Sequence, residues 1–453
     1  MSSPTQQDSL SNSLAEFNEL ITNGSIAEVR SRLVGLHPAD VAHLLESLPR
    51  EDRLAVWDLV ESQIQGEVLL HVIDDVRSSL IRQMDREDLI NATEGLETDD
   101  LADFLSDLPP ALSARVLQSM DEQHRQRLEA VMSYPEDTAG GLMNTDTITI
   151  RPDINLEVVQ RYLRLHGAIP EMTDNLIVVN RESKYLGTIA LTDLLVKDPT
   201  LTVAEIINRE SDAIPASMPE KEVASLFERR DLVSAPVVDD NGVLLGRITI
   251  DDVVDVIRDE ADHSLMSMAG LNEEDDMFAP VITSSRRRTF WLGLNLLTAL
   301  LASWVIGQFE ATIQKLVALA VLMPIVASMG GIAGSQTLTI VIRAIALGRL
   351  GSSNARRLLL KELFVGILNG LIWAVIVGGI SILWFDNDQL GIILGVAMLA
   401  NLIVAALAGA SIPLALKKFG VDPALAGGVL LTTVTDVIGF LAFLGLAAAF
   451  LVN

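Results

Sequence analysis

The stretch LLTTVTDVIGF, residues 430–440, lies inside the last long apolar run of a chain of 453 residues. It places one aspartate, Asp436, among residues that are otherwise apolar or carry only a hydroxyl group. Inserting a carboxylate at the depth of a bilayer costs about 2.5–3.5 kcal/mol, so such a residue is seldom found there without a partner or a task. Asp436 is therefore the first candidate for a functional residue.

Five apolar runs make up the chain beyond residue 288, and each is long enough to cross about 30 Å of hydrocarbon. The runs are residues 290–307, 316–348, 358–385, 390–416 and 424–452. We therefore expect residues 289–453 to form an α-helical transmembrane domain with five spans.

The charged residues between the runs predict how the spans are oriented. Lys and Arg lie at 286–288, 349–361 and 417–418, whereas acidic residues lie at Glu310 and in 386–388. Positively charged flanks tend to remain on the cytoplasmic side of a membrane. The pattern predicts a multi-pass protein of the cell (inner or plasma) membrane, with its amino terminus in the cytoplasm and its carboxyl terminus outside.

Charge divides the chain into an acidic half and a hydrophobic half. The whole chain carries 33 Lys and Arg, 60 Asp and Glu, and a net charge of −27. Residues 286–453 hold only 11 of the basic and 6 of the acidic residues, so the part before them has a net charge of −32. Such an excess argues against nucleic-acid binding and favours an inorganic cation as partner; a solvated acidic surface is the alternative. The chain has no cysteine, which excludes disulfides and thiolate metal sites.

Residues 25–133 form an acidic segment with apolar residues at helical spacing. The stretch HPADVAHLLESLP at 37–49 aligns without gaps to ETDDLADFLSDLP at 97–109, and DREDLINATEGL at 85–96 is a weaker copy. Repetition of this kind indicates a small solenoid of short helices. The polar segment before it, residues 1–24, lacks the apolar core of a secretory signal, and we expect it to be disordered.

Two similar βαββα units follow, at residues 134–199 and 200–262. The second holds the strands APVVD and LLGRITI, joined by a DNG turn, and the first holds LIVVN and YLGTIAL in the same order. This tandem resembles a pair of CBS domains.

The CBS resemblance implies a nucleotide site in the second unit. In that family a Gly, a Ser or Thr, and an Asp spaced as in GRITIDD hold an adenine nucleotide, and Gly246, Thr249 and Asp252 match that spacing. The first unit has Ala190 in place of the hydroxyl residue, so only one ATP site is expected. The alternative is that Thr249 and Asp252 merely cap the helix that follows.

The second apolar run contains PIVASMGGIAGSQ, residues 324–336, in which three glycines follow a proline. Such a backbone is tolerated in a bilayer only against protein or a water-lined cavity. Close packing of helices through small residues is the alternative. Together with Asp436, the motif predicts an ion path. Its candidate residues are Asp436, Thr432, Thr433, Gly330, Gly331, Gly334, Gln336 and Asp422.

Some polar residues near or inside the runs have a competing structural explanation. Asp422 precedes a proline, which is the usual arrangement at the start of a helix, so a capping role competes with a place on the ion path. Asn295, Asn369 and Asn401 are isolated amides within spans, and we expect them to form interhelical hydrogen bonds.

Acidic residues at helical spacing gather in the soluble half. They are Asp99 and Asp103 in the repeats, and Asp252, Asp255, Asp259, Glu260 and Asp262 in the helix after the second unit. Like charges at this spacing repel each other. A divalent ion would relieve the repulsion by bridging carboxylates, and would keep most of its water if it is Mg²⁺. A solvated acidic face is the alternative.

The order of these parts resembles the MgtE family of magnesium channels over nearly the whole chain. The shared features are the acidic solenoid, the phrase SYPEDTAGGLM at 133–143, tandem CBS units, and five spans with a Pro- and Gly-rich second span and TTVTDV in the fifth. The resemblance implies a multi-domain membrane protein, with an α-helical solenoid, a tandem CBS (α+β) module, a plug-like connecting helix at 263–288 and a five-helix pore domain. It also implies a homodimer in the lipid bilayer, with the pore at the dimer interface and hydrated Mg²⁺ bound at Asp436.

The resemblance further implies that Mg²⁺ bound to the cytoplasmic domains holds the pore shut. The residues that it implies for this regulation are Asp99, Asp103, Glu222, Asp231, Asp252, Asp255, Asp259, Glu260 and Asp262. The chain departs from well-known members in the second span, where Ile332 and Ser335 replace asparagines. The resemblance therefore does not extend to selectivity among Mg²⁺, Mn²⁺ and Co²⁺.

We thus expect a Mg²⁺-selective channel for magnesium uptake that closes when cytosolic Mg²⁺ is high. One alternative is a secondary carrier of Mg²⁺, Co²⁺ or Mn²⁺, for which an intramembrane aspartate and interrupted helices are equally natural. Another is a membrane-anchored CBS sensor of metal or nucleotide. An enzyme is not expected, because no nucleophile, base and orienting group occur together at a readable spacing.

Overall fold

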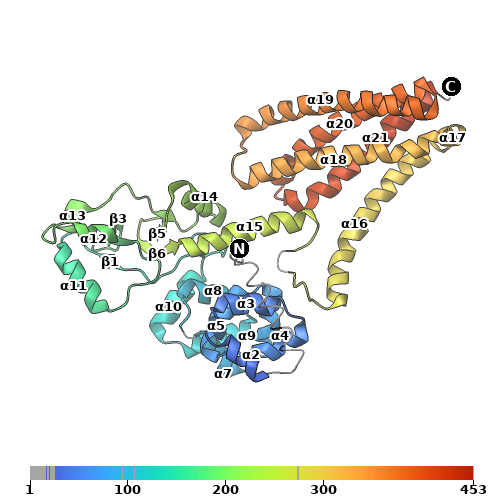
Figure 1. Ribbon diagram of the computed structural model, residues 1–453. Helices are drawn as coiled ribbons and strands as arrows, with labels where there is room; N and C mark the ends of the chain where they lie inside the picture. Colours follow the sequence, from blue (N-terminus) through green and yellow to red (C-terminus); the bar gives the residue numbers. More distant parts are fainter. Residues whose placement is uncertain are drawn as a thin grey trace, which may run out of the picture. The chain divides into compact units, whose positions relative to one another are not determined.

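The computed structural model of the protein describes residues 17, 20, 26–93, 95–106, 108–272 and 275–451. The segment predicted to be disordered, residues 1–24, lies outside the described residues except at Phe17 and Leu20. The chain divides into two compact units, which Figure 1 shows. The first consists of Met1–Ala261 and Glu274–Ala279, and the second of Asp262–Glu273 and Pro280–Asn453.

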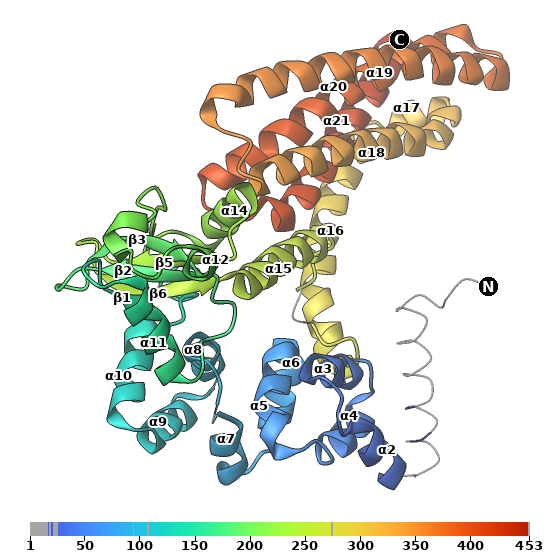
Figure 2. The same ribbon diagram turned by 60° about the vertical axis from the view of Figure 1, so that its left-hand side comes forward.

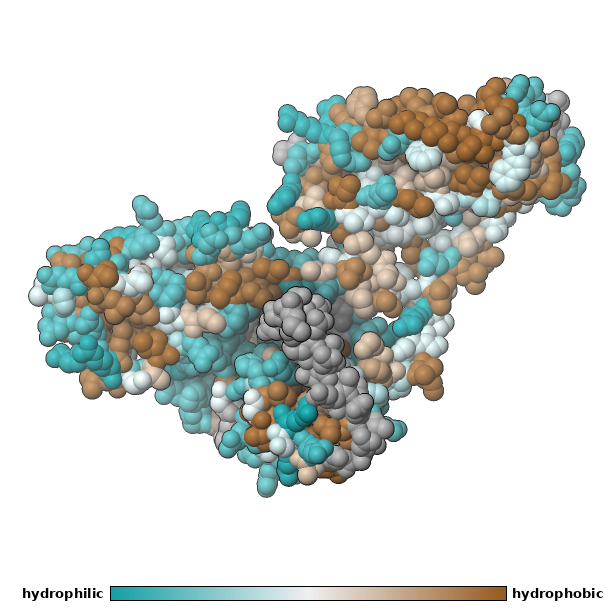
Figure 3. Space-filling view, in the orientation of Figure 1, coloured by the Kyte–Doolittle hydropathy of each residue, from teal (hydrophilic) through white to brown (hydrophobic). Residues whose placement is uncertain are grey.

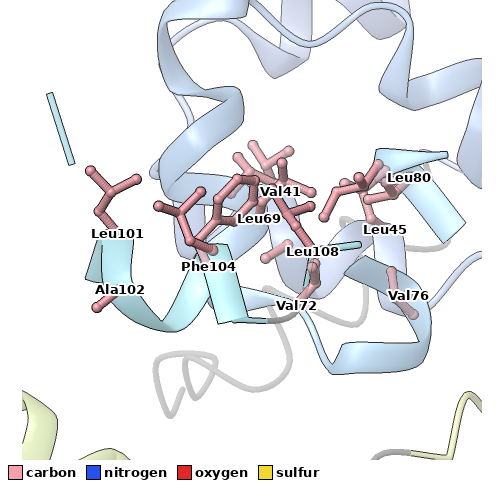
Figure 4. Close-up of a cluster of buried hydrophobic side chains, with 14 of the residues drawn as sticks. Val41, Leu45, Leu69, Val72, Val76, Leu80, Leu101, Ala102, Phe104 and Leu108 are labelled. Carbon is pink, nitrogen blue, oxygen red and sulfur yellow. The ribbon is translucent and has the colours of Figure 1, made fainter. Parts of the chain in front are cut away.

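The first unit begins with a stack of short helices. Those described are α2 (Ile26–Leu33), α3 (Pro38–Glu46), α4 (Arg50–Trp57), α5 (Ser62–His71), α6 (Asp74–Ile81), α7 (Arg86–Thr93), α8 (Thr98–Ser106), α9 (Pro110–Ser119) and α10 (Glu122–Val131). Apolar residues from helices distant in sequence, such as Val41, Leu69 and Phe104, form one buried core (Figure 4). This is the helical solenoid that the repeated sequence predicts.

A hydrogen-bonding pattern repeats along the stack. Nε of Arg53 donates to the carbonyl of Leu45 at 2.8 Å, and Nε of Arg77 donates to the carbonyl of Leu69 at 3.0 Å. The hydroxyl of Ser113 donates in the same way to a carbonyl eight residues earlier. Because the last carbonyls of a helix have no partner within it, these side chains satisfy the helix ends and join consecutive helices.

Two three-stranded sheets complete the first unit (Figure 2). The first repeat is β1 (Thr149–Ile150), α11 (Leu156–His166), β2 (Asn175–Val179), β3 (Tyr185–Ala190) and α12 (Leu191–Val196), followed by the short α13 (Val203–Ile206). The second repeat is β4 (Ile214–Pro215), α14 (Glu220–Arg230), β5 (Ser234–Val238), β6 (Leu244–Thr249) and α15 (Ile250–Met268). Each sheet has one parallel and one antiparallel pair, and Asn175 faces Ala190 as Ser234 faces Thr249. The predicted tandem α+β module is confirmed.

The second unit contains, among its described residues, five helices long and apolar enough to cross a membrane. They are α16 (Val281–Gly307), α18 (Ala318–Ala346), α19 (Ser352–Phe385), α20 (Asp388–Lys418) and α21 (Pro423–Phe450), with the short α17 (Glu310–Lys315) after α16. Helix α20 is the most buried and packs against α18, α19 and α21. Hydrophobic residues cover much of the surface of these helices (Figure 3). The prediction of five spans is confirmed.

The connecting segment differs from its prediction. The family resemblance implies one connecting helix at 263–288, but α15 includes the first of these residues and α16 includes the last. Helix α15 ends before Gly270, which has a φ of +69° and donates its N–H to the carbonyl of Ser267. Residues with a Cβ atom rarely adopt this left-handed conformation, so glycine ends the helix here. Pro280 then marks the start of α16.

Candidate functional site

An open cavity of about 940 Å³ lies in the membrane unit between α18 and α21. Thr432 and Asp436 line it from α21, and Gly331 and Gln336 line it from α18. The structure thus brings together four of the residues that the sequence predicts for an ion path. Among the described residues that line the cavity, Asp436 is the only charged one.

The α18 wall of the cavity is one face of that helix. Ser328, Ile332, Ser335 and Thr339 lie on it at the spacing i, i+4, i+7 and i+11. Ser328 and Thr339 are not among the residues predicted for the ion path, although this spacing would have shown them. Hydroxyl groups at this spacing can hydrogen-bond the water shell of a cation, which suits an ion that keeps its water.

Three other candidates for the ion path lie outside the cavity lining. Gly330 and Gly334 are buried, the first against Asn401 and the second against Leu431. They are four residues apart and therefore share a face of α18 that differs from the face of Gly331. Thr433 is half-buried and donates its hydroxyl to a carbonyl of its own helix at 2.7 Å.

Asp422 also lies outside the cavity lining, at the start of α21. Its carboxylate accepts the N–H groups of Ala424 and Leu425 at 2.9 and 3.2 Å. It also lies 3.3 Å from Nε2 of His263. The capping role that competed with a place on the ion path is therefore present in the structure.

The three intramembrane asparagines differ in environment. The side-chain amide of Asn401 donates to the carbonyl of Val326 at 2.8 Å, so the predicted interhelical hydrogen bond is confirmed at this position. Asn295 and Asn369 are exposed on the surface of their helices.

In the first unit, carboxylates from the start of α8 and the start of α15 form an acidic cluster of Glu97, Asp99, Asp100, Asp251 and Asp252. Burial, followed by the charge of Asp251, raises the pKa of Asp252 to about 7. Burial, followed by the charge of Glu97, raises the pKa of Asp100 to about 6. Burial, followed by the charge of Asp252, raises the pKa of Asp99 well above its usual value.

One member of the acidic cluster, Asp99, is almost fully buried. Asp99 is only 5% exposed, and within the described part of the chain its buried Oδ1 atom has no hydrogen-bond partner. A buried carboxylate oxygen of this kind is costly unless a proton or a cation compensates it. The cluster therefore holds protons near neutral pH that a divalent cation could displace.

The other residues that the resemblance implies for regulation are exposed, apart from the half-buried Glu260. They are Asp103, Glu222, Asp231, Asp255, Asp259, Glu260 and Asp262. Arg258 lies 3.7 Å from Asp255 and 3.6 Å from Asp259, and Lys221 pairs with Glu260. These basic residues offset part of the repulsion that carboxylate spacing alone predicts.

Metal-ligating side chains do not converge in larger groups within the part of the chain that the structure describes. No three Asp, Glu or His side chains there are arranged to hold one metal ion. A cation at the acidic cluster would therefore be bound by one or two carboxylates and by its own water, as is usual for Mg²⁺.

The predicted nucleotide residues also have local structural roles. The backbone N–H and the hydroxyl of Thr249 donate to the carboxylate of Asp252 at 3.2 and 3.1 Å, which is the capping arrangement. A Cβ atom at Gly246 would lie 2.5 Å from the carbonyl oxygen of Asn144, whose backbone pairs with the next residue, Arg247. Glycine is therefore required at 246 whether or not a nucleotide binds.

A buried ion pair that no motif in the sequence predicts holds the segment before α16. The fully buried Arg53 donates from both terminal nitrogens to Asp276, at 2.8 and 2.9 Å. The backbone N–H of Asp276 donates to the carboxylate of Asp75 at 3.2 Å. Arg53 and Asp276 are 223 residues apart in the sequence. No local pattern distinguishes Arg53 from a surface arginine.

Comparisons with known proteins cover most of the chain. A family model described as a divalent cation transporter, MgtE, matches residues 323–446. The MgtE intracellular N domain model matches residues 36–137, and the CBS domain model matches 139–198 and 203–259.

Individual relatives agree with these matches. The magnesium transporter MgtE of Thermus thermophilus is 32% identical over 436 residues, which are 95% of this chain and 97% of that protein. The magnesium transporter MgtE of Bacillus subtilis is 28% identical over 95% of this chain and 96% of its own. A solved structure of the cytosolic domain of the Mg²⁺ channel MgtE in complex with ATP is 32% identical and covers 54% of this chain and 99% of that chain, with a TM-score of 0.49.

Proposed function

Because this chain belongs to the MgtE family of magnesium transporters, we propose that it carries Mg²⁺ across the membrane along the cavity between α18 and α21. The observation that carries the proposal is the position of Asp436, the only charged residue among the described residues of the cavity lining. Its carboxylate attracts a divalent cation, and the hydroxyl and amide groups nearby bind the water that Mg²⁺ releases reluctantly. Asp436 then acts on the ion through water.

The ion path of this proposal lies between two copies of the chain. In one copy the cavity is open, and the apolar side chains of Ile332 and Ile340 are 56% and 51% exposed beside it. A twofold axis along the cavity would bring the same surface of a second copy against it and would present two copies of Asp436 to the ion. The homodimer is thus the assembly in which one open groove becomes an enclosed path.

The acidic cluster is the proposed sensor of cytosolic Mg²⁺. The basic flanks of the spans support a cytoplasmic first unit, with the carboxyl terminus outside. When Mg²⁺ is scarce the carboxylates repel each other, and when it is abundant a bound ion holds α8 and α15 together. An ion that binds the closed form better favours closure, and closure then strengthens its binding. Further regulatory candidates are Asp103, Glu222, Asp231, Asp255, Asp259, Glu260 and Asp262.

ATP binding at the second CBS unit is a separate part of the proposal, supported by the match of Gly246, Thr249 and Asp252 to the nucleotide motif. Thr249→Val is the variant that tests it, because valine keeps the shape of threonine and removes only the hydroxyl. Titration with ATP by calorimetry should show binding to the wild type and much weaker binding to the variant. Equal affinities would contradict this assignment.

Ion flux into liposomes tests transport itself. Purified wild-type protein should carry Mg²⁺, Asp436→Asn should lose most of this flux, and Asp388→Asn, at an exposed position at the start of α20, should keep it. Raising Mg²⁺ on the side of the first unit should lower the flux. Single-channel current steps support a channel, whereas their absence with intact flux supports a coupled carrier. Flux that is unaffected by Asp436→Asn would refute the ion path and favour a membrane-anchored sensor.

A further inference from the structure

The side chain of Asn401 is fully buried on α20, a helix that does not line the cavity. This side chain contacts α18 and α21, the two helices that line the cavity. Its amide donates to the carbonyl of Val326 on α18, and a Cβ atom at Gly330 of the same helix would lie 2.2 Å from its Nδ2 atom. A Cβ atom at Gly439 of α21 would lie 2.8 Å from that atom. The amide therefore fills a notch that the two cavity helices leave open by carrying glycine.

Stability alone does not explain an asparagine at this position. The Oδ1 atom of Asn401 is buried and has no hydrogen-bond partner among the residues that the structure describes. An unpaired carbonyl in an apolar interior is unfavourable, and interhelical hydrogen bonds within membranes contribute little net stability. An apolar side chain of similar size would avoid this cost. The amide therefore has a role other than stabilising the fold.

Helix α18 depends on an external contact for its position. Pro324 removes one backbone hydrogen bond from it, and its glycines remove side chains that would pack. The bond from Asn401 reaches this helix at Val326, directly before the first cavity-lining residue. On α21 the contact lies at Gly439, three residues after Asp436. The side chain of Asn401 thus contacts both helices that form the cavity walls. Each contact lies within about one helical turn of the polar residues that line the cavity.

We propose that Asn401 is a positioning residue, which fixes the separation and rotation of α18 and α21 and thereby the ion selectivity of the cavity. The inference rests on the proposed function. Asn401 does not touch the ion, and its effect passes through the distance between Asp436 and the polar face of α18. Removing the amide should consequently change which hydrated ion fits, while Asp436 still attracts divalent cations.

Flux ratios in liposomes test the inference. Wild-type protein, Asn401→Leu and the matched control Asn369→Leu are reconstituted, and the fluxes of Mg²⁺, Co²⁺ and Mn²⁺ are compared at equal protein. Asn401→Leu should still conduct but should change the ratio of Mg²⁺ to Co²⁺ flux by about tenfold, within the range that a displacement of about 1 Å in a binding site produces. Asn369→Leu should keep the wild-type ratio, because Asn369 is exposed on its helix.

The double variant G330A/N401A separates the hydrogen bond from simple space filling. The new methyl group at 330 occupies the space of the lost amide, so packing is restored but the bond to Val326 is not. An altered flux ratio in this variant supports the inference even if Asn401→Leu fails to fold. A wild-type ratio in either variant, or loss of folded protein in both, overturns it. Absence of flux in the wild type would instead refute the proposed function.

Discussion

Replacing Asp252 with asparagine is expected to stabilise the metal-free protein above pH 7, although Asp252 accepts two hydrogen bonds from Thr249. Burial and the charge of Asp251 raise the pKa of Asp252 from 3.8 to about 7. One pKa unit corresponds to about 1.4 kcal/mol, so ionising this side chain costs about 4 kcal/mol more in the folded state than in the unfolded state. Asparagine avoids that cost.

Asparagine still offers an oxygen to Thr249, but a bond to a neutral acceptor is weaker than one to a carboxylate. The pKa of about 7 already includes the lowering by these two hydrogen bonds, so the cost of about 4 kcal/mol contains this difference. The net stabilisation of Asp252→Asn is therefore about 4 kcal/mol above pH 7 in the absence of divalent ions.

The dependence on pH has a definite sign. Because the pKa of Asp252 is higher in the folded state, the folded protein binds more protons than the unfolded chain between about pH 4 and pH 7. The free energy of unfolding therefore falls as pH rises through this window, and the contribution of the protonated carboxyl is fully present only below it. Asp100, whose pKa burial raises to about 6, acts in the same direction. Mg²⁺ should restore stability above pH 7, and should do so less in Asp252→Asn.

Hydrogen exchange of the full-length protein in detergent measures these effects at α8 and at the start of α15. Wild type, Asp252→Asn and the control Asp240→Asn, at an exposed position of the same unit, are compared with EDTA and with Mg²⁺ at several pH values. Protection in Asp252→Asn should exceed that of the wild type above pH 7 with EDTA. Lower protection in the variant, or a pH dependence identical to that of the wild type, would refute the electrostatic reasoning.

Three further variants test packing and capping. Arg53→Met leaves Asp276 without its buried partner and should cost about 3–5 kcal/mol, seen as faster hydrogen exchange in α4, with the exposed Arg30→Met as a control that changes little. Asp422→Ala should lower the stability of the membrane unit by about 0.5–2 kcal/mol in thermal unfolding, and Asp422→Asn should keep most of it because asparagine also caps helices. Gly246→Ala should destabilise the second CBS unit by about 1–3 kcal/mol without any nucleotide, since its Cβ atom would meet a backbone oxygen; unchanged melting would show that β6 can shift.

Local patterns in the sequence were sufficient for the elements of this protein. The length and apolarity of the five runs determine the spans, because a bilayer accepts only helices that satisfy their own backbone. The repeats predict the solenoid, and the alternation of strands and helices predicts the tandem sheets. The exception is the segment 263–288, where the left-handed conformation of Gly270 ends α15 inside the connecting helix that the family resemblance implies.

The candidate sites were only partly predictable, because local patterns do not show how separate elements meet. The sequence showed that a carboxylate at Asp436 is energetically costly in an apolar span, and that Pro and Gly interrupt the second span. Each of these features can be read from a single segment. The sequence did not show that Gly331 faces the cavity whereas Gly330 faces Asn401, because that choice depends on the rotation of α18 against its neighbours. It also did not show whether Asp422 caps a helix or lines a path.

What the sequence alone determined is therefore the set of helices and strands, the sign of the charge in each half, and the presence of one carboxylate in an apolar span. Tertiary structure alone decided which residues meet. It placed Asp99 beside Asp252, Arg53 on Asp276, and the amide of Asn401 between two glycines. Secondary structure follows from interactions between near neighbours in the chain, whereas burial, shifted pKa values and contacts across helices depend on segments that approach each other only after folding.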